Sequence, residues 1–177
     1  MIETITKPGL MRGRRGLIMG VANERSIAWS IASAIAAEGG ELAFTYQNDS
    51  IAKRVKPLAS SVGSDFVLNC DVSNDHDLDT VFSAIKEKWG ELDFVVHAIA
   101  YSDKSELKGR YADTTRENFR NTMDISCFSF TNVSRRAAKL MDAGGSLITL
   151  SYLGSVRTIP NYNVMGIAKA ALEASVR

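Results

Sequence analysis

Short apolar runs alternate with longer amphipathic stretches along almost the whole chain. The apolar runs have the length of β-strands and cover residues 16–19, 41–46, 65–69, 92–97 and 146–150. They are too apolar to alternate between a buried and a solvated face, which is typical of parallel strands covered on both sides. The pattern therefore predicts a sheet of buried parallel strands.

The stretches between these runs predict helices, because their apolar residues recur every three or four positions. Ser26 is a candidate N-cap for the first helix, which Gly39 ends. The strongest pattern covers residues 75–89 and ends at Gly90; its apolar face consists of Leu78, Val81, Phe82, Ile85 and Trp89. Further helices are expected at residues 50–60, with an interruption near Pro57, at 115–141 and from about 162 onward.

Strand and helix alternate five times, which favours an α/β fold. Right-handed crossovers then give a Rossmann-like doubly wound parallel sheet. No repeat or linker divides the chain, so residues 1–177 are interpreted as a single domain. The last helix has no stop signal, and the fifth strand would be a long apolar sheet edge. We therefore expect C-terminal strands of the complete sheet to be missing.

Composition narrows the possible functions. Among 177 residues, 21 basic and 20 acidic side chains give a net charge of +1. The one basic cluster, residues 12–15, is interpreted as a solvated segment that leads into the first strand. No nucleic-acid partner is therefore expected. No apolar run approaches the ~20 residues of a membrane span. The two cysteines lack CxxC spacing and there are only two histidines, so no metal site is expected. The polar N-terminus, with Glu3 and Lys7, does not resemble a signal peptide, and a cytoplasmic location follows.

Three strand ends carry candidate ligand contacts, since ligands of doubly wound sheets gather at the carboxyl edge. The segment from Gly20 to Ala28 could bind an anion at a helix N-terminus, or could be only a Ser-capped helix. Asp71 could accept from an adenine amino group, with Val72 beside it, or could cap a turn. Small residues at 98–100 could admit a cofactor, or could reflect close packing.

Tyr162 and Lys169 are separated by seven positions. This is about two helical turns, so both side chains are expected on one helix face. A nearby ammonium favours the ionised form of a phenol and polarises its O–H group. The pair could bind a substrate oxygen and a ribose hydroxyl; the alternative is one interfacial tyrosine and one solvated lysine.

The patterns Gly20-x5-Ser26-x-Ala28 and Tyr162-x2-Met165-x3-Lys169 resemble the divergent branch of the short-chain dehydrogenase/reductases. Residues 41–49 and 149–169 are similar to bacterial enoyl-acyl-carrier-protein reductase almost word for word, and the resemblance covers the whole chain. It implies reduction of trans-2-enoyl thioesters by NADH in type II fatty-acid synthesis. It also implies acyl carrier protein as the carrier of the substrate and a homotetramer as the full-length form.

The resemblance also assigns roles to individual residues. Tyr162 would hydrogen-bond the thioester carbonyl, Lys169 would hold the nicotinamide ribose, and Tyr152 would line the acyl site. Ser102 would lie on the substrate side. The implied cofactor contacts, besides Lys169, are Gly20, Ser26, Ile27, Gln47, Asp71, Val72 and Ile99.

Two other functions stay open. A carbonyl or alcohol dehydrogenase of the same superfamily also uses a tyrosine and a lysine, although the six-residue gap and the second tyrosine, Tyr152, argue against it. A non-catalytic dinucleotide-binding remnant is the other alternative, because the family continues with strands and a substrate-binding segment that this chain lacks.

Overall fold

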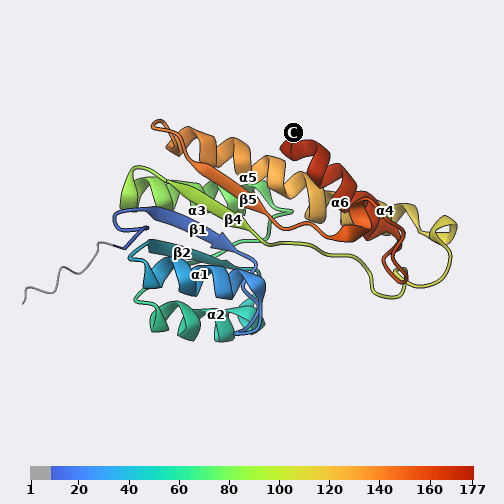
Figure 1. Ribbon diagram of the computed structural model, residues 1–177, viewed down its shortest axis with the longest axis horizontal. Helices are drawn as coiled ribbons and strands as arrows, with labels where there is room; N and C mark the ends of the chain where they lie inside the picture. The colour runs from blue at the N-terminus through green and yellow to red at the C-terminus, as the bar shows by residue number, and fades with distance from the viewer. Residues whose placement is uncertain (1–8) are drawn as a thin grey trace, which may run out of the picture.

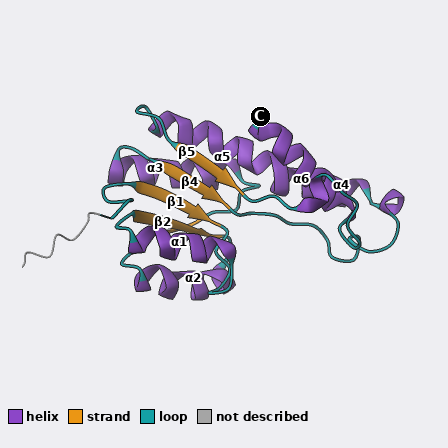
Figure 2. Ribbon diagram, in the orientation of Figure 1, coloured by secondary structure: helices purple, strands orange, loops and turns teal. Residues whose placement is uncertain are grey.

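A computed structural model describes residues 9–177; the polar residues 1–8 lie outside the described part. The strands are β1 (Arg15–Met19), β2 (Glu41–Tyr46), β3 (Val67–Asn69), β4 (Phe94–His97) and β5 (Ser146–Thr149). They form one parallel sheet in the order β3-β2-β1-β4-β5. Figure 2 shows β2, β1, β4 and β5 side by side in orange. Strands β2 and β3 are added on one side of β1, and β4 and β5 on the other side. The strand order therefore reverses between β1 and β4. The predicted Rossmann-like α/β fold is confirmed.

Helices cover both faces of the sheet (Figure 1). One face packs on α1 (Ile27–Ala37) and α2 (Asp49–Ser61), and the other on α3 (Asp75–Trp89) and α5 (Ser129–Ala137). Successive β1 residues alternate between these layers: Ile18 belongs to the first core, Leu17 and Met19 to the second. Burial on both sides accounts for the continuous apolar runs in the central strands.

The predicted helix at 115–141 contains an irregularity. It consists of α4 (Arg116–Met123), a π-helical stretch η2 (Asp124–Phe128), α5 and a short 3₁₀ turn η3 (Ala138–Leu140); the turn η1 (Tyr111–Asp113) precedes it. The Ser129 hydroxyl donates to the Ile125 carbonyl at 2.7 Å across the π-helical stretch. Such stretches often mark functional sites.

Some predicted boundaries are wrong. Helix α2 runs through Pro57 without a break, because this proline is exposed and water can solvate the carbonyl that its ring leaves unpaired. The fourth strand starts at Phe94, since the Leu92 N–H donates to Leu140 O instead of to a strand. Burial in β5 alternates and leaves Ile148 44% exposed, so the expectation of full burial fails for this edge strand.

After β5 the chain forms the 3₁₀ turn η4 (Leu153–Ser155) and then α6 (Asn163–Val176). Figure 1 shows α4 and the start of α6 beyond the carboxyl ends of the strands. Within residues 9–177, no helix is both long and apolar enough to cross a membrane. The same residues contain no group of three or more His, Cys, Asp or Glu side chains placed to hold a metal ion.

Candidate functional site

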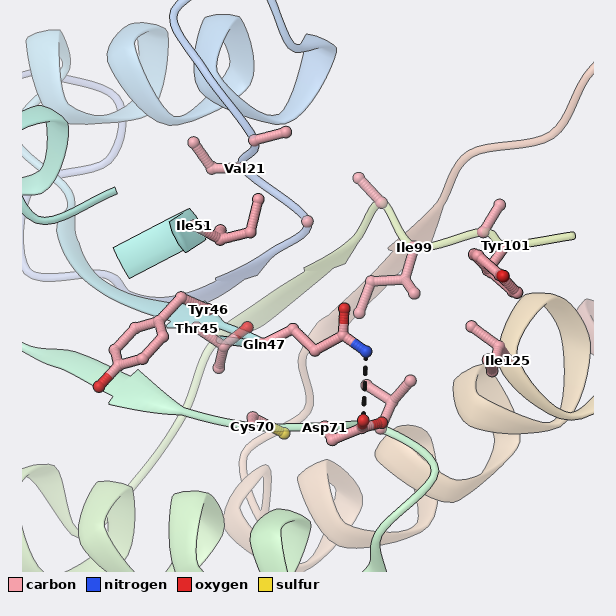
Figure 3. A pocket seen from close by; sticks show the side chains of 15 residues that line it. Val21, Thr45, Tyr46, Gln47, Ile51, Cys70, Asp71, Ile99, Tyr101 and Ile125 are labelled. Atoms are coloured by element: carbon pink, nitrogen blue, oxygen red, sulfur yellow. Dashed lines mark hydrogen bonds between the residues drawn. The ribbon is translucent and has the colours of Figure 1, made fainter. Parts of the chain in front are cut away.

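A cavity of about 480 Å³ opens at the carboxyl edge of the sheet, where the strand order reverses. The ends of β1 to β4 and the π-helical stretch all contribute to its walls, as the side chains in Figure 3 show. It is lined by Gly20, Val21, Ala22, Thr45, Tyr46, Gln47, Ile51, Cys70, Asp71, Val72, Ala98, Ile99, Ala100, Tyr101 and Ile125.

Gly20 brings two strand ends together at this cavity. Its φ of +95° lies in a region that side chains with a Cβ rarely adopt. A Cβ at this position would also lie 2.0 Å from the carbonyl oxygen of Ala98. The turn after β1 therefore needs glycine for its conformation and for its close approach to the end of β4.

Asp71 and Gln47 form the polar wall of the cavity. Gln47 Nε2 donates to Asp71 Oδ2 at 3.1 Å (Figure 3). The other carboxylate oxygen accepts from the N–H and hydroxyl of Ser73. Burial by itself would raise the pKa of Asp71, but these hydrogen bonds outweigh it and lower the pKa below its ordinary value. The carboxylate stays ionised and keeps lone pairs that can accept from a ligand.

Five of the predicted cofactor contacts line this one cavity: Gly20, Gln47, Asp71, Val72 and Ile99. Ser26 and Ile27 lie instead at the start of α1, where the Ser26 hydroxyl donates to Asn23 O at 2.6 Å and Ile27 is 63% exposed. Lys169 belongs to a separate group of residues on α6.

One face of α6, together with its N-cap residue Tyr162, contacts the segment from the end of β5 through η4 at four positions. The Tyr162 ring meets the Tyr152 ring edge-on, with centroids 4.9 Å apart. Gly166 packs closely against Gly154, since a Cβ added to Gly166 would lie only 2.7 Å from Gly154 O. Lys169 Nζ donates to Leu150 O at 2.7 Å, and Glu173 accepts from two serine hydroxyls, Ser151 and Ser155. The four contact positions, 162, 166, 169 and 173, are four, three and four residues apart. This spacing places Tyr162 and Lys169 on one helix face, as the sequence predicts.

Tyr162 is a half-buried phenol with a raised pKa. Burial is the main cause, and Tyr152 adds to it. The sequence analysis expected the opposite direction from a nearby ammonium. Burial and Tyr152 account for the raised pKa, and the Lys169 ammonium instead donates to the carbonyl of Leu150, just after β5. Tyr162 therefore stays protonated and keeps its O–H donor at neutral pH.

Lys169 is only 6% exposed, and its burial lowers the pKa of its amine. Close to it lies His97, the last residue of β4, whose pKa falls to about 4 through burial and the charge of Lys169. His97 is thus neutral, and its ring nitrogens meet the hydroxyls of Ser129 at 2.8 Å and Thr149 at 3.2 Å. These contacts tie β4, β5 and α5 together beneath the lysine.

Ser102 is buried inside a polar network. Its hydroxyl lies 3.3 Å from Asn118 Oδ1, to which it donates, and accepts from Thr122 Oγ1 at 2.9 Å. Asn118 Nδ2 in turn donates to Glu106 Oε2 at 3.2 Å, and Glu106 accepts from both the N–H and the hydroxyl of Thr115. In this network Ser102 anchors the loop between β4 and α4.

Several residues of the site lie outside the contacts that the sequence predicts. The end of β2, with Thr45 and Tyr46, could have been found, because it lies at the same sheet edge as Gln47. Ile125 reaches the cavity only through the π-helical stretch, and Ser126 there both accepts from Tyr101 N and donates to Tyr101 O, each at 2.9 Å. No local pattern signals these two contacts.

The sheet, the glycine turn after β1 and the cavity at the carboxyl edge are typical of α/β domains of the dinucleotide-binding class. A family model described as Enoyl-(Acyl carrier protein) reductase matches residues 20–177. The chain belongs to this family, as the resemblance in the sequence indicated.

Relatives and solved structures agree with this assignment. The chain is 68% identical over 169 residues to Enoyl-[acyl-carrier-protein] reductase [NADH] 2 of Rhizobium meliloti, covering 96% of this chain and 63% of that protein. The crystal structure of FabI from Candidatus Liberibacter asiaticus superposes with a TM-score of 0.93 at 56% identity, covering 96% of this chain and 66% of that one. The Anaplasma phagocytophilum enoyl-(acyl-carrier-protein) reductase in complex with NAD has the same TM-score at 54% identity, covering 96% and 65%. The chain thus spans a little under two thirds of the length of these proteins.

Proposed function

We propose that the protein is an NADH-dependent enoyl-acyl-carrier-protein reductase that converts trans-2-enoyl thioesters to saturated acyl thioesters. The observation that carries the proposal is the face of α6, where Tyr162 packs on Tyr152 and Lys169 reaches the end of β5. This face presents a phenol donor and a buried ammonium on the carboxyl side of the sheet. The cavity lies at the same edge, at the ends of β1 to β4. Membership of the enoyl reductase family supports the same reaction.

The residues at the cavity fit a dinucleotide. Because Gly20 has no Cβ, the turn after β1 packs closely on Ala98, and its backbone is free to contact a ligand. The ionised Asp71 could accept a hydrogen bond from an adenine amino group. Val72 and Ile99 would enclose the base, and the helix N-terminus at Ser26 and Ile27 favours a pyrophosphate. We propose that residues 1–177 act as a single NAD-binding domain through these contacts. Bound NADH would supply the hydride for the β-carbon of the enoyl group.

Tyr162 and Lys169 would do the protein's part of the chemistry. The neutral Tyr162 phenol would donate to the thioester oxygen, and this hydrogen bond would strengthen as negative charge develops there. Lys169 uses one donor on Leu150 O, so two remain for ribose hydroxyls. Tyr152, 50% exposed beside Tyr162, would contact the acyl chain, and Ser102 would shape the substrate side through its loop.

NADH should be preferred over NADPH. Gln47 follows β2, where a 2′-phosphate would need an arginine or a lysine. Its amide is already held by Asp71, whose negative charge would repel a phosphate. Comparison of kcat/KM for the two cofactors tests this, and a clear NADPH preference would contradict it.

We propose in addition that the protein acts in the cytoplasm on enoyl thioesters carried by acyl carrier protein, and that it assembles as a homotetramer. Exposed apolar side chains along β5 and around α6, such as Ile148, Val156 and Ile167, support self-association. Sedimentation velocity would measure the assembly, and a strictly monomeric active protein would contradict it.

The decisive experiment combines dinucleotide titration with NADH oxidation assays of the full protein. Crotonyl thioester should be reduced faster than any simple ketone. Faster ketone reduction would favour a carbonyl or alcohol dehydrogenase. Dinucleotide binding without turnover of either substrate would indicate a non-catalytic binding module.

A further inference from the structure

Two asparagines with unusual backbone conformations flank Tyr162. Asn161 has a φ of +59° and Asn163 a φ of +23°, and within residues 9–177 no other residue except glycine has a positive φ. Asparagine tolerates this region better than most residues, but a positive φ still persists only where surrounding contacts enforce it. The backbone is thus constrained on both sides of the proposed substrate donor.

The side chain of Asn163 binds a loop distant in sequence. Its Nδ2 donates to Glu106 O at 3.0 Å, to Lys108 O at 3.3 Å and to Gly109 O at 3.4 Å. Asparagine at a helix start usually caps the helix by accepting from its N–H groups. Asn163 instead donates away from α6, so its amide fixes the loop and the start of the helix to each other.

The loop that Asn163 holds is itself rigidly attached. Glu106 accepts from Thr115 and from Asn118, and Asn118 belongs to the buried network of Ser102 and Thr122. The start of α6 is therefore connected through Asn163 to α4, and not only to its neighbours in the chain.

The Tyr162 ring is limited from a second direction. A Cβ added to Gly154 would lie 2.4 Å from Tyr162 Cδ1, so the ring packs directly on the backbone of η4. The η4 turn fixes the ring, and Asn163 fixes the backbone that carries it. Together these contacts determine where the phenol oxygen lies.

We propose that Asn163 is a positioning residue, which sets the phenol of Tyr162 by fastening the start of α6 to the loop at residues 106–109. The inference rests on the proposed function for its catalytic consequence. Its structural part, the dependence of the Tyr162 environment on the Asn163 amide, can be measured independently of turnover.

The test compares Asn163→Asp and Asn163→Gly with Asn161→Gly in the full protein. Asn163→Asp keeps the shape but loses the donor, and Asn163→Gly keeps the positive φ but loses the side chain. Asn161→Gly is the matched control, since it also keeps a positive φ and alters an exposed side chain next to Tyr162. If one Asn163 variant does not fold, the other still decides the outcome.

Three quantities are measured. NMR of ¹³C-labelled tyrosine, assigned with Tyr162→Phe, follows the titration of the phenol, and hydrogen exchange follows residues 106–115. Steady-state kinetics with crotonyl thioester, with NADH affinity measured separately, gives the catalytic effect.

Both Asn163 variants should show faster exchange in the loop and a Tyr162 titration closer to that of an exposed tyrosine. They should also lower kcat by about 10²-fold, as expected for a misplaced catalytic group, with NADH affinity nearly unchanged. The Asn161→Gly control should match the wild type. Faster loop exchange with an unchanged Tyr162 titration would overturn the inference. If the wild type fails to reduce crotonyl thioester, the proposed function fails, and the titration alone decides whether Asn163 positions Tyr162.

Discussion

The cavity at the sheet edge and the Tyr162 face of α6 are constructed in different ways. The cavity is shaped by the ends of four parallel strands, and at Gly20 a Cβ would collide with the backbone carbonyl of Ala98. The Tyr162 face depends on side-chain contacts between α6 and segments outside the sheet, such as the Tyr152 ring and Asn163. A backbone-built site tolerates substitutions of its side chains, whereas a site built from side chains can lose its geometry through one of them.

The largest effect should come from the Tyr162 hydroxyl itself. Tyr162→Phe should lower kcat by about 10²–10³-fold, the usual effect of losing one oxyanion donor. NADH affinity should change little, because the cavity residues are untouched. Single-turnover kinetics and NADH titration would measure the two effects separately, and unchanged turnover would exclude Tyr162 from the mechanism.

A glycine substitution at each region sharpens the comparison. Gly20→Ala should weaken NADH binding by about 5–30-fold, because a positive φ costs an alanine roughly 1–2 kcal/mol and the turn would move away from its cofactor-binding shape to relieve this strain. The clash with Ala98 O adds to this, since that oxygen cannot move without β4. Fluorescence titration with NADH checks the prediction, and wild-type affinity would show that the turn is not part of the cofactor site.

Gly154→Ala should affect the other region. The new Cβ would meet the Tyr162 ring, a side chain that can rotate, so the protein should fold with a displaced phenol. We expect kcat to fall by about tenfold with NADH affinity unchanged. A fall in NADH affinity equal to that of Gly20→Ala would show that the two regions are not independent.

The smallest effect concerns Glu173. Hydrogen bonds from Ser151 and Ser155 lower the pKa of this carboxyl below its ordinary value of 4.5. A lowered folded-state pKa adds stability at neutral pH, which is lost as the pH falls below 4.5. Glu173→Gln should therefore lower the melting temperature slightly at neutral pH and not at all in acid. Thermal melts across this range measure it, and a difference that grows in acid would contradict it.

The contrast between the regions also explains what sequence could predict. Strands, most helices and the carboxyl-edge contacts follow from local signals: apolar runs, helical periodicity and a glycine after the first strand. Gln47 and Asp71 lie where strand ends must meet once the sheet is parallel. The seven-residue spacing of Tyr162 and Lys169 likewise fixes a shared helix face.

Contacts between distant segments could not be predicted in this way. Asn163 binds carbonyls 54 to 57 residues earlier, and nothing near it in sequence marks those partners. The hydrogen bonds of Ser102 to Asn118 and Thr122, 16 and 20 residues later, are a second case. The direction of the Tyr162 pKa shift depends on the burial of the phenol beside Tyr152, which spacing does not determine.

The π-helical stretch Asp124–Phe128 has a consequence for how this segment can vary. One residue more or less in a helix turns everything beyond it by about 100°. A π-helical turn holds one residue more than an α-helical turn, so loss of a single codon here should return the stretch to an α-helix and keep α5 in its present phase, in which Val133 and Ala137 face the core and Ser129 meets His97. The same loss inside α5 would instead bring Ser134 to the place of Val133, a core residue, because no extra residue is available there to absorb it. Among length variants of this segment, one-residue deletions should therefore be more frequent between α4 and α5 than within α5.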